Sequence, residues 1–175
     1  MSQGIILKNF VAIKKYYRGF VVYELIGQDG CEFSPFSIFQ RDFIDNPASH
    51  SASTLKIART AVAKFLDYLE EVESFNGQSN PHVLRFVVNQ YPDFLADNVN
   101  SDNHLLKSAH DSLKSFKPKL NSYDSYKSHI TYVNAYLDLS EKIAREAIEI
   151  LIAKTGLSSN ERYEAIFPMV WELKE

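Results

Sequence analysis

The sequence has few of the residues that mark a secreted or membrane protein. Its 175 residues include a single cysteine, Cys31, so no internal disulfide can form, and this fits a reducing cytoplasm. No apolar run approaches the ~18 residues that a membrane-spanning helix needs. The N-terminus also lacks the basic start and long apolar stretch of a signal peptide. We therefore expect a cytoplasmic protein without membrane contact.

The sequence also lacks the common signatures of catalytic and cofactor sites. It has only six glycines, and none form a phosphate-binding loop or a Gly-x-Ser-x-Gly elbow. Its five histidines are scattered and far along the chain from Cys31, without the spacing of metal ligands. Solvent or boundary histidines are the favoured interpretation. We expect no catalytic residue, no metal site and no cofactor in this chain.

The charge is small and of the wrong sign for a protein that coats nucleic acid. Nineteen Lys and Arg residues stand against 22 Asp and Glu, which gives a net charge of −3. Any contact with DNA must therefore come from a local patch. Apolar residues make up 45% of the chain and aromatics 13%, which is enough for a buried core and excludes a disordered chain.

The first part of the chain has the pattern of strands. Residues 5–13 and 20–25 are rich in β-branched and aromatic side chains, and Arg18-Gly19 separates them. Gln28-Asp29-Gly30 is a turn signal, which residues 31–33 can follow as a short return strand. We expect a small hairpin or meander, then a short helix over 37–43 with Ser37 as its cap, ended by Asn46-Pro47.

From Ser53 onward, apolar residues recur with the 3.6-residue period of an α-helix. Residues 54–74 carry an apolar stripe, with Ser53 or Thr54 as the cap and Asn76-Gly77 as the stop. A second helix is expected after Pro81, with a break at Pro92, and a third over 101–116. A fourth begins at about residue 125 and merges at Ser140 into a fifth, which ends at Gly156. A last helix is expected over 160–173. The fold class is therefore mainly α, a helical bundle preceded by a small β element. We divide the chain into a β element with a short helix (1–47), a helical domain (48–156) and a C-terminal helix or linker (157–175).

The helix over 54–74 carries its charges against the helix dipole. Lys56 and Arg59 lie in its first two turns, whereas Glu70, Glu71 and Glu73 lie at its end. A solvated face tolerates this arrangement. Alternatively, the helix start faces a polyanion, with hydroxyl groups and two cations converging on phosphate. Two further local excesses of positive charge support a patterned distribution: Lys8, Lys14, Lys15 and Arg18, and Lys114, Lys117, Lys119 and Lys127, the latter diluted by Asp124.

The stretch 25–69 resembles the N-terminal region of phage-integrase-type tyrosine recombinases. In that pattern a strand ends in an Asp-Gly turn, and a short helix, a small-residue stretch and a helix ending in Phe-Leu-x-Tyr/Phe-Leu follow. Residues 84–95 are similar to the family's second helix, and residues 126–137 to its last helix. The matching positions of the first stretch are Asp29, Gly30, Phe39, Phe43, Ser51, Ser53, Thr54, Ala61, Phe65, Leu66 and Leu69.

The resemblance implies a helical core-binding, SAM-like domain that grips duplex DNA. A separate C-terminal domain would cut and rejoin the strands, and other recombinase subunits would be partners of the parent protein. His82-Val-Leu-Arg85 mimics the catalytic His-x-x-Arg of that domain, but we interpret it as a coincidence within the second helix. This chain would then be an N-terminal piece without enzymatic activity. The DNA-binding residues that we expect stand at two helix starts: Ser53, Thr54, Lys56, Arg59, Lys127, Ser128 and His129.

Two other hypotheses remain. The first is an all-helical protein–protein interaction module, which the net charge of −3 favours. The exposed edge of the N-terminal strands could pair with a partner in that case. The second is an enzyme of a class that the sequence does not reveal.

Overall fold

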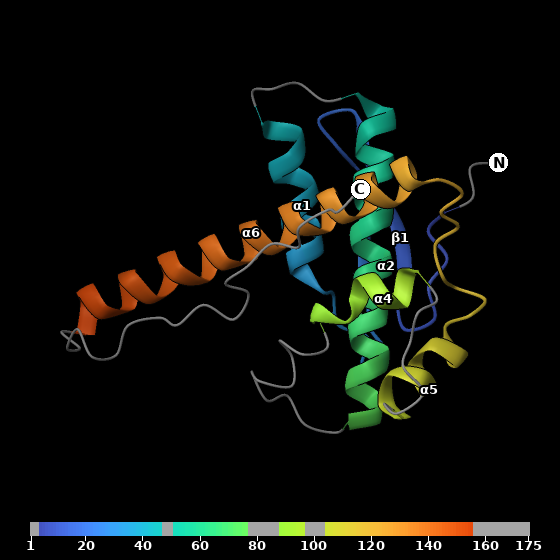
Figure 1. Ribbon diagram of the computed structural model, residues 1–175. Helices are drawn as coiled ribbons and strands as arrows, with labels where there is room; N and C mark the ends of the chain where they lie inside the picture. Colours follow the sequence, from blue (N-terminus) through green and yellow to red (C-terminus); the bar gives the residue numbers. More distant parts are fainter. Residues whose placement is uncertain (1–3, 47–50, 77–87, 97–103, 156–175) are drawn as a thin grey trace.

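The computed structural model describes residues 4–46, 51–76, 88–96 and 104–155. The protein is mainly helical and begins with a two-stranded antiparallel sheet, which confirms the predicted fold class at this level. Helix α2 (Ala52–Asn76) lies at the centre, and α1 (Ser34–Asp45), α5 (His104–Ser112) and α6 (Tyr123–Thr155) pack against it (Figure 1). The short helix α4 (Tyr91–Leu95) lies against the second half of α2.

Strands β1 (Val11–Tyr17) and β2 (Phe20–Ile26) form a hairpin with Tyr17 opposite Phe20. The two loop residues, Arg18 and Gly19, have φ values of 50° and 82°. Positive φ at both positions is the geometry of a type I′ turn, which matches the twist of a hairpin. Arg18 is held there by an ion pair of 3.1 Å with Asp45. The expected return strand over 31–33 is reduced to a single bridge between Ile26 and Glu32.

Helix α1 begins at Ser34, three residues earlier than expected, because Pro35 fits the first turn of a helix. The prediction of Ser37 as the cap is wrong, since its hydroxyl lies within the helix and donates a 2.5 Å hydrogen bond to Glu32. The end at Asp45 before Asn46-Pro47 is confirmed. The buried side chain of Gln40 bonds to both the N–H and the carbonyl of Tyr23, at 2.9 and 2.8 Å, and joins α1 to β2.

Helix α2 is longer than the predicted 54–74 by two residues at each end. Its cap is Ser51, whose Oγ accepts a 3.1 Å hydrogen bond from the Thr54 N–H, so the assignment of the cap to Ser53 or Thr54 is wrong. The predicted apolar stripe is confirmed, because its side chains are almost entirely buried. The buried members are Leu55, Ala58, Ala61, Val62, Phe65 and Leu66.

The later helices follow the prediction in outline. A turn at Gln90 interrupts the helical backbone, and Pro92 lies in the first turn of the new helix α4. Helix α5 ends at Ser112 and is followed by turns, so it is shorter than the expected 101–116. Helix α6 is continuous through Ser140, which confirms the expected merger. The predicted helix over 160–173 and most of the one after Pro81 lie outside the described residues.

One hydrophobic core joins the β element to the helices. Tyr23 and Leu25 of β2 and Phe36 of α1 belong to the same cluster as α2, α4 and α6. Side chains on both sides of the predicted boundary at residue 47 therefore share one core, and the division into domains stays a prediction. The second half of α6 extends beyond the packed helices (Figure 1).

Candidate nucleic-acid interface

A groove of about 910 Å³ lies between the first half of α2, the 115–120 segment and the start of α6. Within the part of the chain that the structure describes, Asp124 is the single acidic residue of the groove's lining, and four lysines line it: Lys56, Lys64, Lys117 and Lys119. Five hydroxyl side chains lie among them: Ser53, Thr60, Ser115, Ser125 and Ser128. A chain with a net charge of −3 thus has a local excess of positive charge at a concave surface.

The α2 side of the groove follows from helical periodicity. Ser53, Lys56 and Thr60 are spaced by three and four residues and continue to Lys64, so they form a stripe along one face. The stripe is on the face opposite the buried Ala58–Val62–Phe65 side chains. The same periodicity that builds the core therefore places the cations on the groove side.

Lys64 fixes the walls of the groove. Its Nζ donates hydrogen bonds to the carbonyl oxygens of Ile6, at 2.8 Å, and Phe116, at 2.5 Å. Within the described residues it forms no ion pair. Burial lowers its pKa, whereas the nearby charge of Asp67 raises it. A half-buried ammonium group without a carboxylate partner is a fixed positive charge that favours a bound anion.

The α6 side of the groove begins with a second capped helix. The Ser122 Oγ accepts a 3.1 Å hydrogen bond from the Ser125 N–H. Ser125 and Ser128 line the groove from the first turns of α6, and His129 follows beneath them with only 5% of its surface exposed. Burial, and to a lesser extent Lys64, lowers the pKa of His129 to about 4. The imidazole is therefore neutral at pH 7 and provides no charge for a phosphate.

The two helix starts that the sequence singled out do lie on one groove. Ser53 and Lys56 line it from α2, and Ser128 and His129 from α6. Thr54 and Lys127 are not among the lining residues. The Thr54 hydroxyl lies 2.9 Å from the Ser51 hydroxyl, and Lys127 is exposed elsewhere on α6.

Arg59, which the sequence predicts as a DNA-binding residue beside Lys56, is buried and makes internal contacts. Its side chain is 8% exposed, and its Nη1 donates a 2.7 Å hydrogen bond to the carbonyl of Val21. The guanidinium carbon lies 5.0 Å from the centre of the Tyr23 ring, and burial lowers the pKa of the group. Arg59 thus joins α2 to β2, because the hairpin covers the side of α2 from which Arg59 projects.

Internal contacts also explain much of the inverted charge pattern of α2. The Glu71 carboxylate accepts hydrogen bonds from Lys8, at 2.6 Å, Asn9, at 2.9 Å, and Ser112, at 2.8 Å. Burial opposes ionisation of Glu71, but these three donors together lower its pKa. Glu71 therefore fastens the N-terminal segment and α5 to α2. Because Lys8 is engaged here and Arg18 pairs with Asp45, two of the four N-terminal cations belong to internal ion pairs.

The set of residues expected from the sequence omitted three of the groove's four lysines. Lys117 and Lys119 belong to the lysine run over 114–119, and this run was the available signal. The sequence around Lys64 does not distinguish it from exposed lysines, because its carbonyl partners are 58 and 52 residues away along the chain. The Lys117 Nζ also lies 5.2 Å from the centre of the Phe94 ring, which connects the groove to α4.

Within the described residues, no three His, Cys, Asp or Glu side chains are grouped as metal ligands would be. None of the described helices has the length and apolar character needed to cross a membrane. No family model, curated protein or solved structure matches the chain.

Proposed function

We propose that this chain binds duplex DNA through its phosphates, with the lysine groove as the contact surface. The observation that carries the proposal is the convergence of four lysines from two parts of the chain on one groove, whose described lining includes a single carboxylate. Phosphate contacts supply most of the sequence-independent affinity for DNA. The hydroxyl groups along the groove add neutral hydrogen-bond donors for phosphate oxygens.

Duplex is the form of DNA that the groove favours. Proteins that bind single strands stack the bases on aromatic side chains, in addition to neutralising the backbone. Among the described residues that line this groove, none is a phenylalanine, tyrosine or tryptophan. The groove therefore provides contacts for a phosphate backbone and no stacking platform for unpaired bases.

We further propose that the chain acts as a core-binding, SAM-like module of a site-specific tyrosine recombinase. The stretch 25–69 and the stretch 126–137 carry the resemblance to that family, and α2 and α6 of these stretches form two walls of the groove. In this role the chain grips duplex DNA, a separate C-terminal domain cuts and rejoins the strands, and other subunits hold the partner sites. The chain itself provides no catalytic residue.

A fluorescence-anisotropy titration with a labelled 25-base-pair duplex tests the proposal. If four lysines each neutralise one phosphate, log K falls against log salt with a slope of about −3.6. A single strand of the same sequence binds more weakly at every salt concentration. Absence of binding to duplex at low salt, or a tighter complex with the single strand, contradicts the proposal.

One observation favours the alternative of a protein–protein interaction module. Strand β1 is exposed along most of its length, and it presents Val11 and Tyr16 with 65% and 69% of their surfaces accessible. An edge of this kind can pair with a strand of a partner. The DNA titration separates the two functions, because a module of this kind shows no salt-dependent affinity for duplex.

A further inference from the structure

Two exposed isoleucines line the lysine groove. Ile6 of the N-terminal segment and Ile57 of α2 are 61% and 53% exposed. Both are large apolar side chains in contact with water, and they sit among cations on a surface that is otherwise suited to phosphate. A ligand that offers only phosphate leaves these side chains unused. A ligand that alternates phosphates with apolar groups contacts both kinds of side chain.

Both isoleucines line the same groove as Lys64. Ile57 lies seven residues, two helical turns, before Lys64 on the same face of α2. The carbonyl of Ile6 accepts the 2.8 Å hydrogen bond from Lys64. The N–H groups of the nearby Lys8 and Asn9 donate to the Asp67 carboxylate at 3.0 and 2.8 Å. The N-terminal segment is therefore fastened to α2 at Ile6 and again at Lys8 and Asn9, which holds the backbone of Ile6 against the helix.

We propose that Ile6 and Ile57 pack against the sugars between the bound phosphates and make the groove select DNA over RNA. Successive phosphates of a strand are joined through a sugar, so apolar side chains that share a groove with phosphate-binding lysines can meet that sugar. Deoxyribose presents a methylene group at C2′, which suits an apolar contact. Ribose presents a hydroxyl there, which would lose its water against isoleucine without gaining a partner. This inference rests on the proposed binding of duplex DNA.

The test compares a 20-base-pair DNA duplex with an RNA duplex of the same sequence at one salt concentration. We expect the full chain to bind the DNA duplex at least about tenfold more tightly, since an unpaired buried hydroxyl costs about that factor or more. In the Ile6→Thr/Ile57→Thr double variant the ratio falls to within about threefold, because threonine offers the ribose hydroxyl a partner. Both positions are exposed, so circular dichroism should show an unchanged fold.

Lys56→Gln is the matched control, because it removes a phosphate contact common to both duplexes. It should weaken both complexes by a similar factor and leave the ratio unchanged. Equal binding of DNA and RNA by the unmodified chain overturns this inference while leaving duplex binding intact. An unchanged ratio in the double variant also overturns it, because the helical form of the duplex would then determine the selection. Failure to bind either duplex overturns the inference together with the proposed function.

Discussion

The hydroxyl of Tyr91 and the Nε2 of His129 lie 2.7 Å apart in the core and join α4 to the start of α6. Both side chains are buried, and Tyr91 is completely so. The pair replaces the water that each polar atom would otherwise require. It also fixes the first turns of α6, which carry Ser125 and Ser128 into the groove.

The buried imidazole should make stability depend on pH. Burial, followed by Lys64, lowers the pKa of His129 to about 4, below its ordinary value of 6.5. The unfolded chain therefore binds a proton that the folded chain does not between these values, so the free energy of unfolding falls as pH decreases from 6.5 towards 4. The loss approaches ~3 kcal/mol at the acid end of this range.

Urea unfolding at pH 7 and pH 4.5 measures this dependence, with His129→Gln as the control. Glutamine can still share a hydrogen bond with Tyr91 and does not titrate. We expect the decrease in stability between the two pH values to be smaller in the variant. An identical decrease in both proteins would show that other groups control the acid sensitivity.

Lys56 and Arg59 should differ sharply in their effect on stability, although they are three residues apart. Arg59→Ala removes the hydrogen bond to the Val21 carbonyl and the contact with Tyr23, and should lower the free energy of unfolding by about 1–3 kcal/mol. Lys56→Ala changes an exposed side chain and should alter stability by no more than about 0.5 kcal/mol. Chemical denaturation of both variants checks this, and equal effects would contradict the structural role of Arg59.

Lys64 should contribute to both stability and affinity. Lys64→Met keeps much of the side-chain volume but leaves the carbonyls of Ile6 and Phe116 without their donor. We expect a loss of about 1–2 kcal/mol in the free energy of unfolding. DNA binding should also weaken, whereas Lys119→Met should weaken binding alone. A stable Lys64→Met variant with full affinity would remove Lys64 from both roles.

The carboxylate of Asp67 should protect two backbone amides of the N-terminal segment, those of Lys8 and Asn9, from hydrogen exchange. Asp67→Asn replaces one of the oxygens that accept the Lys8 and Asn9 N–H groups with a donor. We expect hydrogen exchange to accelerate at least about tenfold at the amide that loses its acceptor, since a hydrogen bond to a charged group contributes about 1.5–3 kcal/mol. NMR exchange rates measure this, and unchanged protection would show that other contacts hold the segment.

Local patterns in the sequence were sufficient to place α2 and α6 and insufficient for the partners of individual side chains. The stripe of α2 is a property of spacing alone, so Ala58, Val62 and Phe65 could be assigned to the core. The cap could not be assigned, because Ser51, Ser53 and Thr54 are chemically equivalent candidates in adjacent positions. Choosing among them requires the backbone direction at the helix start.

The sequence pattern located groove residues that stand at helix starts, and it missed contacts between distant parts of the chain. Lys56 and Ser128 were identified because cations and hydroxyls at a helix start are visible in the sequence. The burial of Arg59 was missed because its partner, Val21, is 38 residues earlier. His129 looked like a member of a polar helix start, but burial against Tyr91 makes it neutral. Such burial depends on how the helices pack, and spacing within one helix does not contain that information.

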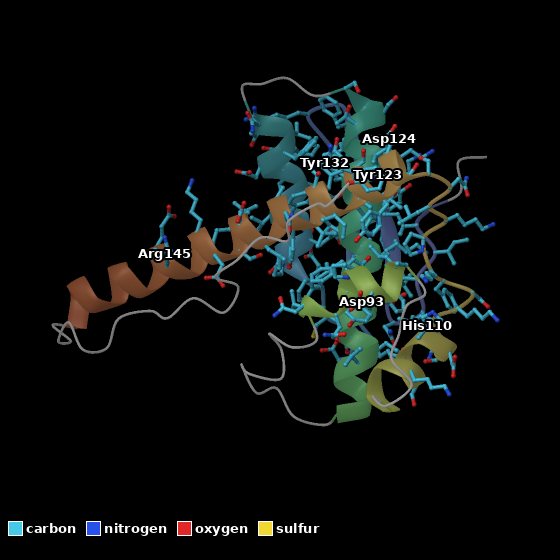
Figure 2. The ribbon with its side chains drawn as sticks, in the orientation of Figure 1. Asp93, His110, Tyr123, Asp124, Tyr132 and Arg145 are labelled. Atoms are coloured by element: carbon cyan, nitrogen blue, oxygen red, sulfur yellow. The ribbon has the colours of Figure 1, made fainter. Side chains whose placement is uncertain are left out.

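The most direct test of the lysine groove compares two double variants that remove the same charge. Lys56→Gln/Lys119→Gln removes two cations of the groove. Lys142→Gln/Arg145→Gln removes two exposed cations from the second half of α6, and Arg145 lies far along this helix from Asp124 at the groove (Figure 2). Both variants lower the net charge equally, so only the position of the lost charge differs.

The measurement is the salt dependence of binding to the labelled duplex for both variants. The groove variant should bind more weakly, and its slope should change from about −3.6 to about −1.8, because two phosphate contacts are lost. The α6 variant should keep the affinity and slope of the unmodified chain. Equal weakening in both variants, or full affinity in the groove variant, would contradict the assignment of DNA binding to this groove.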